Sequence, residues 1–461
     1  MQLHIIGLGV CQTAQLDSHA CAALAGADLV IGSERQLETV SELLASGQKT
    51  LLLPNLKELK PELEKRANQG TASVAILASG DPLFYGIGRW FSRQFDAYRT
   101  AQNLFFYPAV SSVQAACHRL ALSLQDVTVF SLHGRPLEKI RTILKRNKTL
   151  VILTDKCSTP QILAQECIAA GFAESQLIVC ESLGYPQEKV TRYNAVQLAT
   201  SEAEFDPLHV TVIETRGPGG VLPEFPGIPD ASFVTDAEAG KGMLTKREVR
   251  LAILSLLQGA DHDVIWDVGA GCGGVAVELS YWNKWSRVYA VEHHADRLRC
   301  LEANRQRFGV TSNLTLVPGR APEVLKDLPP PDKVFIGGSD GELAGVLQTV
   351  WSLLPAGGVL VASAVTETTK QHLLGFYDQR REHQDAETET LQIAVNKGDV
   401  LAGQLLYRPA LPVTLFRFVK GSKSVEVINI SGITKEPEVT KAPEVTKVPE
   451  ITKAPGETNN D

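Results

Sequence analysis

A glycine-rich segment between two apolar runs carries the most specific chemical signal in the sequence. Residues 264–274 read VIWDVGAGCGG, so three apolar residues precede Asp267 and four glycines follow it closely. Glycines permit positive φ angles and let a ligand approach the backbone. The order predicts a buried strand, a tight turn and a helix, as in nucleotide-type sites. The alternative is a glycine turn in an ordinary α/β core.

A carboxylate after the next apolar run indicates how a nucleoside would be held. Residues 287–291 predict a second strand that ends at Glu292, and a carboxylate at a strand tip can accept both ribose hydroxyls. NAD and S-adenosylmethionine sites share this logic. Asp267 would repel a pyrophosphate but suits the cationic amino and sulfonium groups of S-adenosylmethionine. We therefore expect S-adenosylmethionine here. Its methionine end would lie at Asp267, Gly269, Gly271 and Gly273, and its ribose at Glu292.

The composition indicates a soluble globular protein of two or three domains. The chain has 461 residues, 44% hydrophobic content and a net charge of −7, which gives no overall attraction to nucleic acid. Its eight cysteines show no C-x-x-C spacing and read as buried side chains of a reducing compartment, so we expect no metal site. No signal peptide or run of ~20 apolar residues is present, which predicts a cytoplasmic protein without membrane contact.

The first half alternates strand-like and helical runs, which predicts two small α/β lobes over residues 1–215. The first lobe should contain a mostly parallel sheet. Ligands of such sheets lie beyond the carboxyl ends of the strands, where Gly7, Gly9 and Asp81 fall. Ser111 is a candidate N-cap for a helix that reaches Leu120.

The second half predicts an α/β domain followed by a different kind of segment. Residues 216–235, rich in proline and glycine, read as a linker, and residues 236–420 as a second domain. Thr245 and Glu248 form a capping-box pattern at a helix start. Strands at 390–395 and 413–418 lack a full helix between them and should pair as a hairpin. The six-residue repeat within 421–461 cannot build a core and is predicted to be disordered.

Both halves resemble known families. The Gly7-Leu8-Gly9 turn, ASGDPLFYGIG at 78–88 and Ser111-Ser112 resemble the tetrapyrrole methylase family. TKREVR at 245–250, DVGAGCGG at 267–274, GGSDGEL at 337–343 and LPAGGVLV at 354–361 resemble decarboxylating corrin methyltransferases, which have a class I (Rossmann-like) fold. The combination is similar to the decarboxylating C5,15-methyltransferase family of cobalamin biosynthesis.

This resemblance implies methylation of C5 and C15 of a small-molecule corrinoid precursor, precorrin-6, with loss of the C12 acetate carboxyl group. It implies two S-adenosylmethionine sites and a homo-oligomer. The first cofactor would be surrounded by Gly7, Gly9, Asp81, Leu83 and Ser112. In the second domain Gly337 and Gly338 would border the methyl group. Substrate contacts would come from Ser339, Lys246, Arg247 and Arg250.

The resemblance has two departures. The first glycine turn continues from Gly9 with Val10 and Cys11, where the family usually has a further glycine or an acidic residue. Arg320 stands in a loop where related enzymes often carry an acidic residue that could meet the adenine amino group. Arginine cannot accept a hydrogen bond, so the backbone or a neighbouring residue should do so.

Several alternatives stay open at this point. Asp81 could cap the turn that follows it through Asp81-Pro82. The three basic residues near the second site could form a solvated helix face. The chain could be an RNA methyltransferase, or a fusion in which only the second domain is catalytic. No residue pattern identifies a general acid or base.

We expect the first site to methylate C5, and the second to methylate C15 and decarboxylate.

Overall fold

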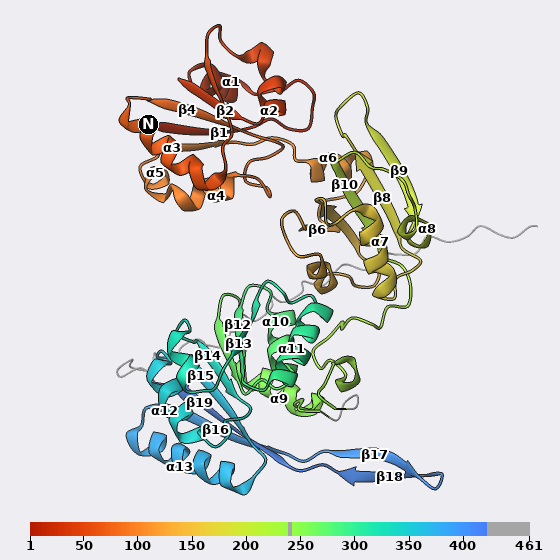
Figure 1. Cartoon of the computed structure of the whole chain (residues 1–461), viewed down its shortest axis with the longest axis vertical. Coiled ribbons are helices and arrows are strands. Elements are labelled where there is room, and N and C mark those ends of the chain that lie inside the picture. The colour runs from red at the N-terminus through yellow and green to blue at the C-terminus, as the bar shows by residue number, and fades with distance from the viewer. Residues whose placement is uncertain (238–241, 422–461) are drawn as a thin grey trace, which may run out of the picture. The chain divides into compact units, whose positions relative to one another are not determined.

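The computed structural model describes residues 1–237 and 242–421, which belong to the compact unit Met1–Gly421 (Figure 1). The predicted disordered repeat therefore lies, from residue 422 onward, outside the described residues. The elements that position the candidate sites belong to three larger sheets.

The first sheet is wholly parallel, as predicted, because each of its strands is followed by a helical crossover. Its strand order is β3-β2-β4-β1-β5. The strands are β1 Gln2–Gly7, β2 Leu29–Gly32, β3 Lys49–Leu52, β4 Ser73–Ala78 and β5 Leu104–Tyr107. The helices are α1 Ser18–Ala25, α2 Glu34–Thr39, α3 Leu56–Asn68, α4 Gly88–Gln94 and α5 Asp96–Thr100.

The second lobe begins with helix α6 (Ser112–Arg119) and contains a mostly antiparallel sheet. Ser111 caps α6 as predicted, because its hydroxyl accepts from Gln114 N at 3.1 Å. The strand order is β6-β7-β10-β8-β9, and only β6 and β7 are parallel. The elements are β6 Val127–Ser131, β7 Thr149–Leu153, α7 Pro160–Ala169, β8 Gln176–Glu181, β9 Lys189–Asn194, α8 Ala195–Ala199 and β10 His209–Glu214. Strand β9 was not predicted.

The third sheet has seven strands in the order β13-β12-β11-β14-β15-β19-β16, and confirms the predicted class I architecture. The first five strands are parallel, whereas β19 is antiparallel to both β15 and β16. Its strands are β11 Val264–Val268, β12 Arg287–Glu292, β13 Leu314–Pro318, β14 Lys333–Ile336, β15 Val359–Ala364, β16 Ala386–Ile393 and β19 Val413–Lys420. Its helices are α9 Arg247–Leu257, α10 Gly274–Trp282, α11 Ala295–Arg307, α12 Leu343–Leu353 and α13 Glu367–His383.

Helix α9 begins one residue later than predicted. Lys246 has φ −65° and ψ 147° and is therefore the N-cap, and its side chain forms no capping hydrogen bond. The predicted capping box of Thr245 and Glu248 is wrong because helical dihedral angles start only at Arg247.

The end of the predicted linker packs onto the second domain. Ile228 and Phe233 are buried in the same apolar cluster as residues of α9, α10 and β11. The Glu278 carboxylate on α10 accepts hydrogen bonds from Gly227 N and Ile228 N at 3.0 and 2.8 Å. These contacts make residues 227–233 part of the framework of the second domain.

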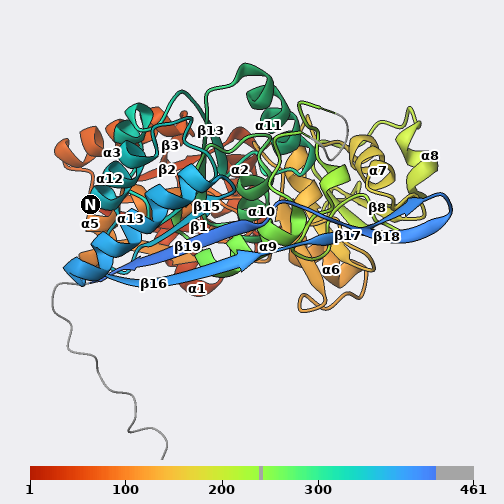
Figure 2. The same cartoon turned by 90° about the horizontal axis from the view of Figure 1, so that it is seen from below.

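The late strands pair with each other as predicted, but their connection is a second, separate hairpin. Strands β17 (Asn396–Leu401) and β18 (Gln404–Pro409) form an antiparallel ribbon that extends away from β16 and β19 (Figure 2). The sequence pattern does not predict this ribbon, because its strands lack the apolar alternation of a buried sheet.

Candidate active sites

The glycine turn after β11 has the predicted strand–turn–helix geometry. Gly269, Gly271 and Gly273 have φ angles of 73°, 59° and 90°, which side-chain-bearing residues rarely adopt. A Cβ atom on Gly269 would lie 2.4 Å from Gly338 O, so the loops after β11 and β14 approach each other closely. Gly273 is required for a different reason, which is packing against a side chain: a Cβ atom there would lie 2.1 Å from Leu301 Cδ1.

Asp267 lies beneath this turn. Its side chain is buried, Oδ2 accepts from Ala276 N at 2.9 Å, and Oδ1 has no hydrogen-bond partner among the described residues. Burial, together with a smaller contribution from the nearby Glu292 carboxylate, raises the pKa of Asp267 to about 7. Asp267 therefore braces the turn and is not part of the cavity wall.

A cavity of about 550 Å³ opens above the turn, at the carboxyl ends of the parallel strands. The predicted residues that line it are Gly269, Gly271, Glu292, Gly337, Gly338, Ser339 and Lys246. The predicted residues outside the lining are Asp267, Gly273, Arg247 and Arg250.

The Glu292 carboxylate connects two of the loops at this cavity. Oε2 accepts from Gly271 N at 2.9 Å, and Oε1 accepts from His293 N and His294 N at 2.8 and 2.9 Å. These backbone donors fix the carboxylate at the end of β12, which is the position expected of a ribose ligand.

Arg250 does not serve as the predicted substrate ligand. Its side chain is fully buried, where Nη1 pairs with Asp230 at 2.7 Å and Nε with Glu278 at 3.2 Å. The prediction is wrong because Arg250 lies on the core-facing side of α9. Arg247 lies on the exposed side and pairs with Glu248 at 3.5 Å, as the alternative of a solvated helix face anticipated.

The residues at this cavity fit the S-adenosylmethionine that the sequence indicates. A Cβ atom on Gly338 would meet nothing within 4 Å, so the wall there is bare backbone that a ligand can contact. The unpartnered Oδ1 of Asp267 places a buried carboxylate oxygen beneath the same turn, which favours a cationic group nearby.

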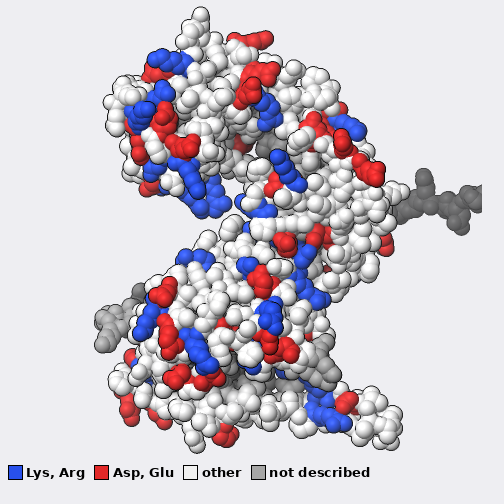
Figure 3. All heavy atoms as spheres, viewed as in Figure 1, with Lys and Arg blue, Asp and Glu red and all other residues white. Residues whose placement is uncertain are grey.

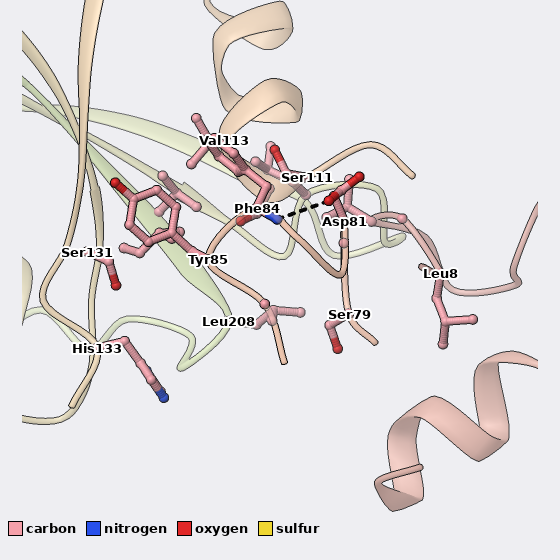
Figure 4. A pocket seen from close by; sticks show the side chains of 18 of the residues that line it. Leu8, Ser79, Asp81, Phe84, Tyr85, Ser111, Val113, Ser131, His133 and Leu208 are labelled. Atoms are coloured by element: carbon pink, nitrogen blue, oxygen red, sulfur yellow. Dashed lines mark hydrogen bonds between the residues drawn. The ribbon is translucent and has the colours of Figure 1, made fainter. Parts of the chain in front are cut away.

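A second cavity, of about 650 Å³, lies between the two lobes of the first half. Gly9, Asp81, Leu83 and Ser112, four of the five residues predicted to surround the first cofactor, line this cavity. Figure 4 shows Asp81 and Ser111 on one side of this space and Ser131 and His133 on the other. Gly7 is not in the lining. A Cβ atom there would lie 2.8 Å from Gly80 O, so this glycine allows close packing behind the cavity.

The Asp81 carboxylate caps the turn that follows it. Oδ1 accepts from Leu83 N and Phe84 N at 2.8 and 3.0 Å, and Oδ2 accepts from Ala109 N at 3.3 Å (Figure 4). This is the turn-capping role considered as the alternative for Asp81. The side chain therefore holds the cavity wall in shape while remaining part of it.

The sequence pattern does not predict the basic side chains at this cavity. They are Arg35, Arg89, His133 and Arg135. Arg35 donates to Ser79 Oγ at 3.2 Å, and Arg135 lies over the Tyr85 ring with its Cζ 6.0 Å from the centroid. Only the tertiary structure brings these residues together, since they come from α2, α4 and the loop after β6.

The part of the chain that the structure describes contains neither a group of metal ligands nor a membrane-spanning helix. Within residues 1–237 and 242–421, no three His, Cys, Asp or Glu side chains are grouped as metal ligands. None of the helices in those two ranges combines the length and the apolar character needed to cross a bilayer.

Comparison with known proteins matches both halves of the chain. Residues 2–199 match the model of the Tetrapyrrole (Corrin/Porphyrin) Methylases, and residues 236–420 match the Precorrin methyltransferase domain. A precorrin-6Y C(5,15)-methyltransferase [decarboxylating] from Sinorhizobium sp is 33% identical over 91% of this chain and 96% of its own length. The protein of that name from Mycobacterium tuberculosis is 31% identical over 90% of this chain and 99% of its own length.

A shorter relative matches part of the chain. The probable cobalt-precorrin-6B C(15)-methyltransferase (decarboxylating) of Pyrobaculum calidifontis is 40% identical over 143 residues, which are 31% of this chain and 71% of its own length. The matches to the two longer relatives run through both halves. By this similarity over nine-tenths of its length, the chain belongs to the family of decarboxylating precorrin-6Y C(5,15)-methyltransferases.

Proposed function

We propose that the chain methylates C5 and C15 of precorrin-6 from two S-adenosylmethionine sites and removes the carboxyl group of the C12 acetate. The observation that carries the proposal is the pair of large cavities, of about 650 and 550 Å³. One lies at the strand ends of a sheet in residues 1–215, and the other at the strand ends of a sheet in residues 236–420, the two domains we assign to the reaction. Family membership supplies the substrate class.

The chain's own residues would hold and orient the reactants. When bound, S-adenosylmethionine supplies a methyl group made electrophilic by its sulfonium. At the second cavity Glu292 would bind the ribose, and the bare backbone of Gly269 and Gly338 would let the methionine end lie close to the turn. A bound cation would favour the ionised form of Asp267, whose carboxylate would then attract that cation from beneath the turn. Positioning an electron-rich carbon behind the methyl group is then the main catalytic task.

The first cavity would hold a polycarboxylate substrate through its basic side chains. Arg35, Arg89 and Arg135 offer guanidinium groups, which bind carboxylates in two-point geometry. Gly9, Leu83 and Ser112 would border the cofactor, with Asp81 holding the turn. At the second cavity Lys246 and Ser339 would meet the substrate.

We assign methylation of C5 to the first site, and methylation of C15 with decarboxylation to the second. A relative named for C15 methylation and decarboxylation alone matches only 31% of the chain, which supports one domain carrying both of these steps. Carbon dioxide is lost when the carboxyl C–C bond breaks and its electron pair enters the conjugated macrocycle.

Blocking each cavity separately tests the proposal. Gly338→Leu adds a side chain to open space in the second cavity, and Ser112→Leu adds one to the wall of the first. Calorimetric titration with S-adenosylhomocysteine should give two sites in the parent and one in each variant. With precorrin-6, the variants should form different singly methylated products, and only Ser112→Leu should release carbon dioxide. Identical products, or a parent with fewer than two sites, would contradict the proposal.

We further propose that the chain self-associates through the β17–β18 ribbon. Val400 and Leu405 lie opposite each other, on the face that also carries Tyr407, and their exposed fractions are 67%, 67% and 69%. The other face carries the Asp399–Arg408 ion pair at 2.7 Å. Figure 3 shows few charged atoms at the tip of the ribbon, at lower right. An isolated two-stranded ribbon is marginally stable in water, and two copies can cover the same apolar face symmetrically.

The oligomeric state of the parent and of ribbon variants tests whether the chain self-associates through β17 and β18. In sedimentation velocity the parent should run as a multiple of the single-chain mass, and Val400→Lys with Leu405→Lys should run as one chain. Gln404→Lys, on the charged face of the ribbon, is the matched control and should leave the assembly intact. A parent that sediments as one chain would overturn this proposal.

A further inference from the structure

Three polar side chains meet at the second cavity, each from the loop after a different strand. His293 follows β12, Arg320 follows β13 and Asp340 follows β14, and all three line the cavity. Arg320 Nη1 donates to Asp340 Oδ2, and His293 Nε2 lies 3.3 Å from the same oxygen. Strands β12 and β14 flank β11 on opposite sides. Asp340 therefore reaches across the carboxyl end of β11 to meet both partners.

The ribose ligand assigned above determines where a purine base would lie. Glu292 directly precedes His293, and its backbone oxygen accepts from Gly319 N at 3.0 Å, so the loops after β12 and β13 are neighbours. A ribose held by Glu292 would direct its base toward these two loops, beyond the strand end. His293 and Arg320 are the residues that follow Glu292 and Gly319.

The ion pair has the hydrogen-bonding pattern that an adenine edge requires. Adenine presents an amino donor next to a ring-nitrogen acceptor. A paired aspartate and arginine present an acceptor next to guanidinium donors. Both contacts of Asp340 use Oδ2, which leaves Oδ1 for a ligand. Hypoxanthine has a carbonyl oxygen in place of the amino group. That oxygen and the Asp340 carboxylate are both hydrogen-bond acceptors, so no hydrogen bond would form between them.

We infer that Arg320 and Asp340 recognise the adenine of S-adenosylmethionine at the second site. Asp340 Oδ1 accepts from the exocyclic amine, Arg320 donates to the adjacent ring nitrogen, and His293 holds the carboxylate in place. The inference rests on the proposed use of this cavity for the cofactor. It supplies the acceptor that the loop after β13 lacks, since Arg320 itself can only donate.

Asparagine is the sharpest replacement for Asp340. The residue has φ +48°, a left-handed conformation that asparagine and aspartate tolerate better than other side chains. In Asp340→Asn the amide oxygen would still accept from Arg320, so the NH₂ group would face the ligand. The variant would then offer a donor where the parent offers an acceptor, and should prefer a carbonyl to an amine.

The test is calorimetric titration of the full chain with S-adenosylhomocysteine and with S-inosylhomocysteine, its deaminated counterpart. At the site abolished by Gly338→Leu, the parent should bind the adenine ligand about tenfold or more tightly than the hypoxanthine ligand. Asp340→Asn should remove or reverse this preference. Asp327→Asn, an exposed carboxylate outside the cavity, is the matched control and should leave the ratio unchanged.

The outcomes separate this inference from the proposed function. Equal affinity of the parent for the two ligands at this site would overturn adenine recognition by the pair, while leaving the site a cofactor site. So would a preference that survives in Asp340→Asn. If neither ligand binds at the site, the proposed cofactor use fails, and the inference that depends on it fails as well.

Discussion

Asp267 holds the glycine turn at a cost in stability that depends on pH. Its carboxyl group is buried, with one oxygen bonded to Ala276 N and the other unpartnered among the residues described. Burial raises its pKa from the ordinary 3.8 to about 7, so the folded state favours the protonated form. The resulting stabilisation is complete below pH 3.8 and is lost as the pH rises through 7.

Replacing Asp267 by asparagine should therefore make the stability of the second domain less dependent on pH. The gap between 3.8 and about 7 corresponds to about 4 kcal/mol, all of it lost by pH 8. Asp267→Asn keeps an acceptor for Ala276 N but does not ionise. The difference in unfolding temperature between variant and parent should move in the variant's favour from pH 5 to pH 8. A difference that stays constant with pH would contradict the raised pKa.

Arg250 should matter for folding and not for ligand binding. Its guanidinium neutralises Asp230 and Glu278 in the core, so Arg250→Met leaves buried negative charge without compensation. The expected loss is about 3–5 kcal/mol in the free energy of unfolding. The control Arg247→Ala removes a half-exposed charge from the same helix and should change stability by less than about 0.5 kcal/mol. Chemical denaturation measures both.

These residues also show which features of the candidate site can be predicted from the sequence and which cannot. The spacing of Asp267, the glycines and Glu292 was informative, because each residue type is demanded by the local backbone or by a ligand. Lys246, Arg247 and Arg250 look alike in the sequence, yet one lines the cavity, one is exposed and one is buried. The rotation of α9 against the sheet decides between them, and packing of the whole domain sets that rotation.

At the scale of elements, the start of helix α10 depends on a glycine for two separable reasons. Gly273 is its N-cap with φ +90°, and a Cβ atom there would also collide with Leu301 Cδ1 at 2.1 Å. Gly357 has a similar φ of +79° but nothing within 4 Å. Gly357→Ala should cost about 1 kcal/mol from backbone strain alone, and Gly273→Ala clearly more. Equal shifts in unfolding temperature would show that Leu301 moves aside freely.

Elements were predictable where local periodicity and topology agree. The parallel sheets, the cap at Ser111 and the β16–β19 pairing follow from short-range patterns and from the rule that crossovers join parallel strands. The antiparallel second lobe was not predictable, because β10 inserts between β7 and β8 through contacts distant in sequence. The basic side chains of the first cavity come from α2, α4 and the loop after β6, so their convergence also depends on contacts that are distant in sequence.

At the scale of the whole molecule, two separate cavities predict that the two methylations are separable. A mixture of Ser112→Leu and Gly338→Leu chains contains one intact cavity of each kind. If the singly methylated corrin leaves one chain and enters another, the mixture should form the doubly methylated product that neither variant forms alone. Mass spectrometry of the product mixture measures this. A mixture that forms only singly methylated corrins would require both cavities to act within one chain.

The anchoring of residues 227–233 sets where the protein can be cut. The matched family domain begins at residue 236, yet residues that precede it contact two buried side chains of the domain. Asp230 pairs with Arg250, and Ile228 N donates to the Glu278 carboxylate. A fragment beginning at residue 236 would lack these partners of Arg250 and Glu278. It would also expose to solvent the apolar residues that Ile228 covers. If the two halves are expressed separately, the chain should therefore be divided upstream of Gly227. Residues 227–233 then remain attached to the second domain, whose core they cover.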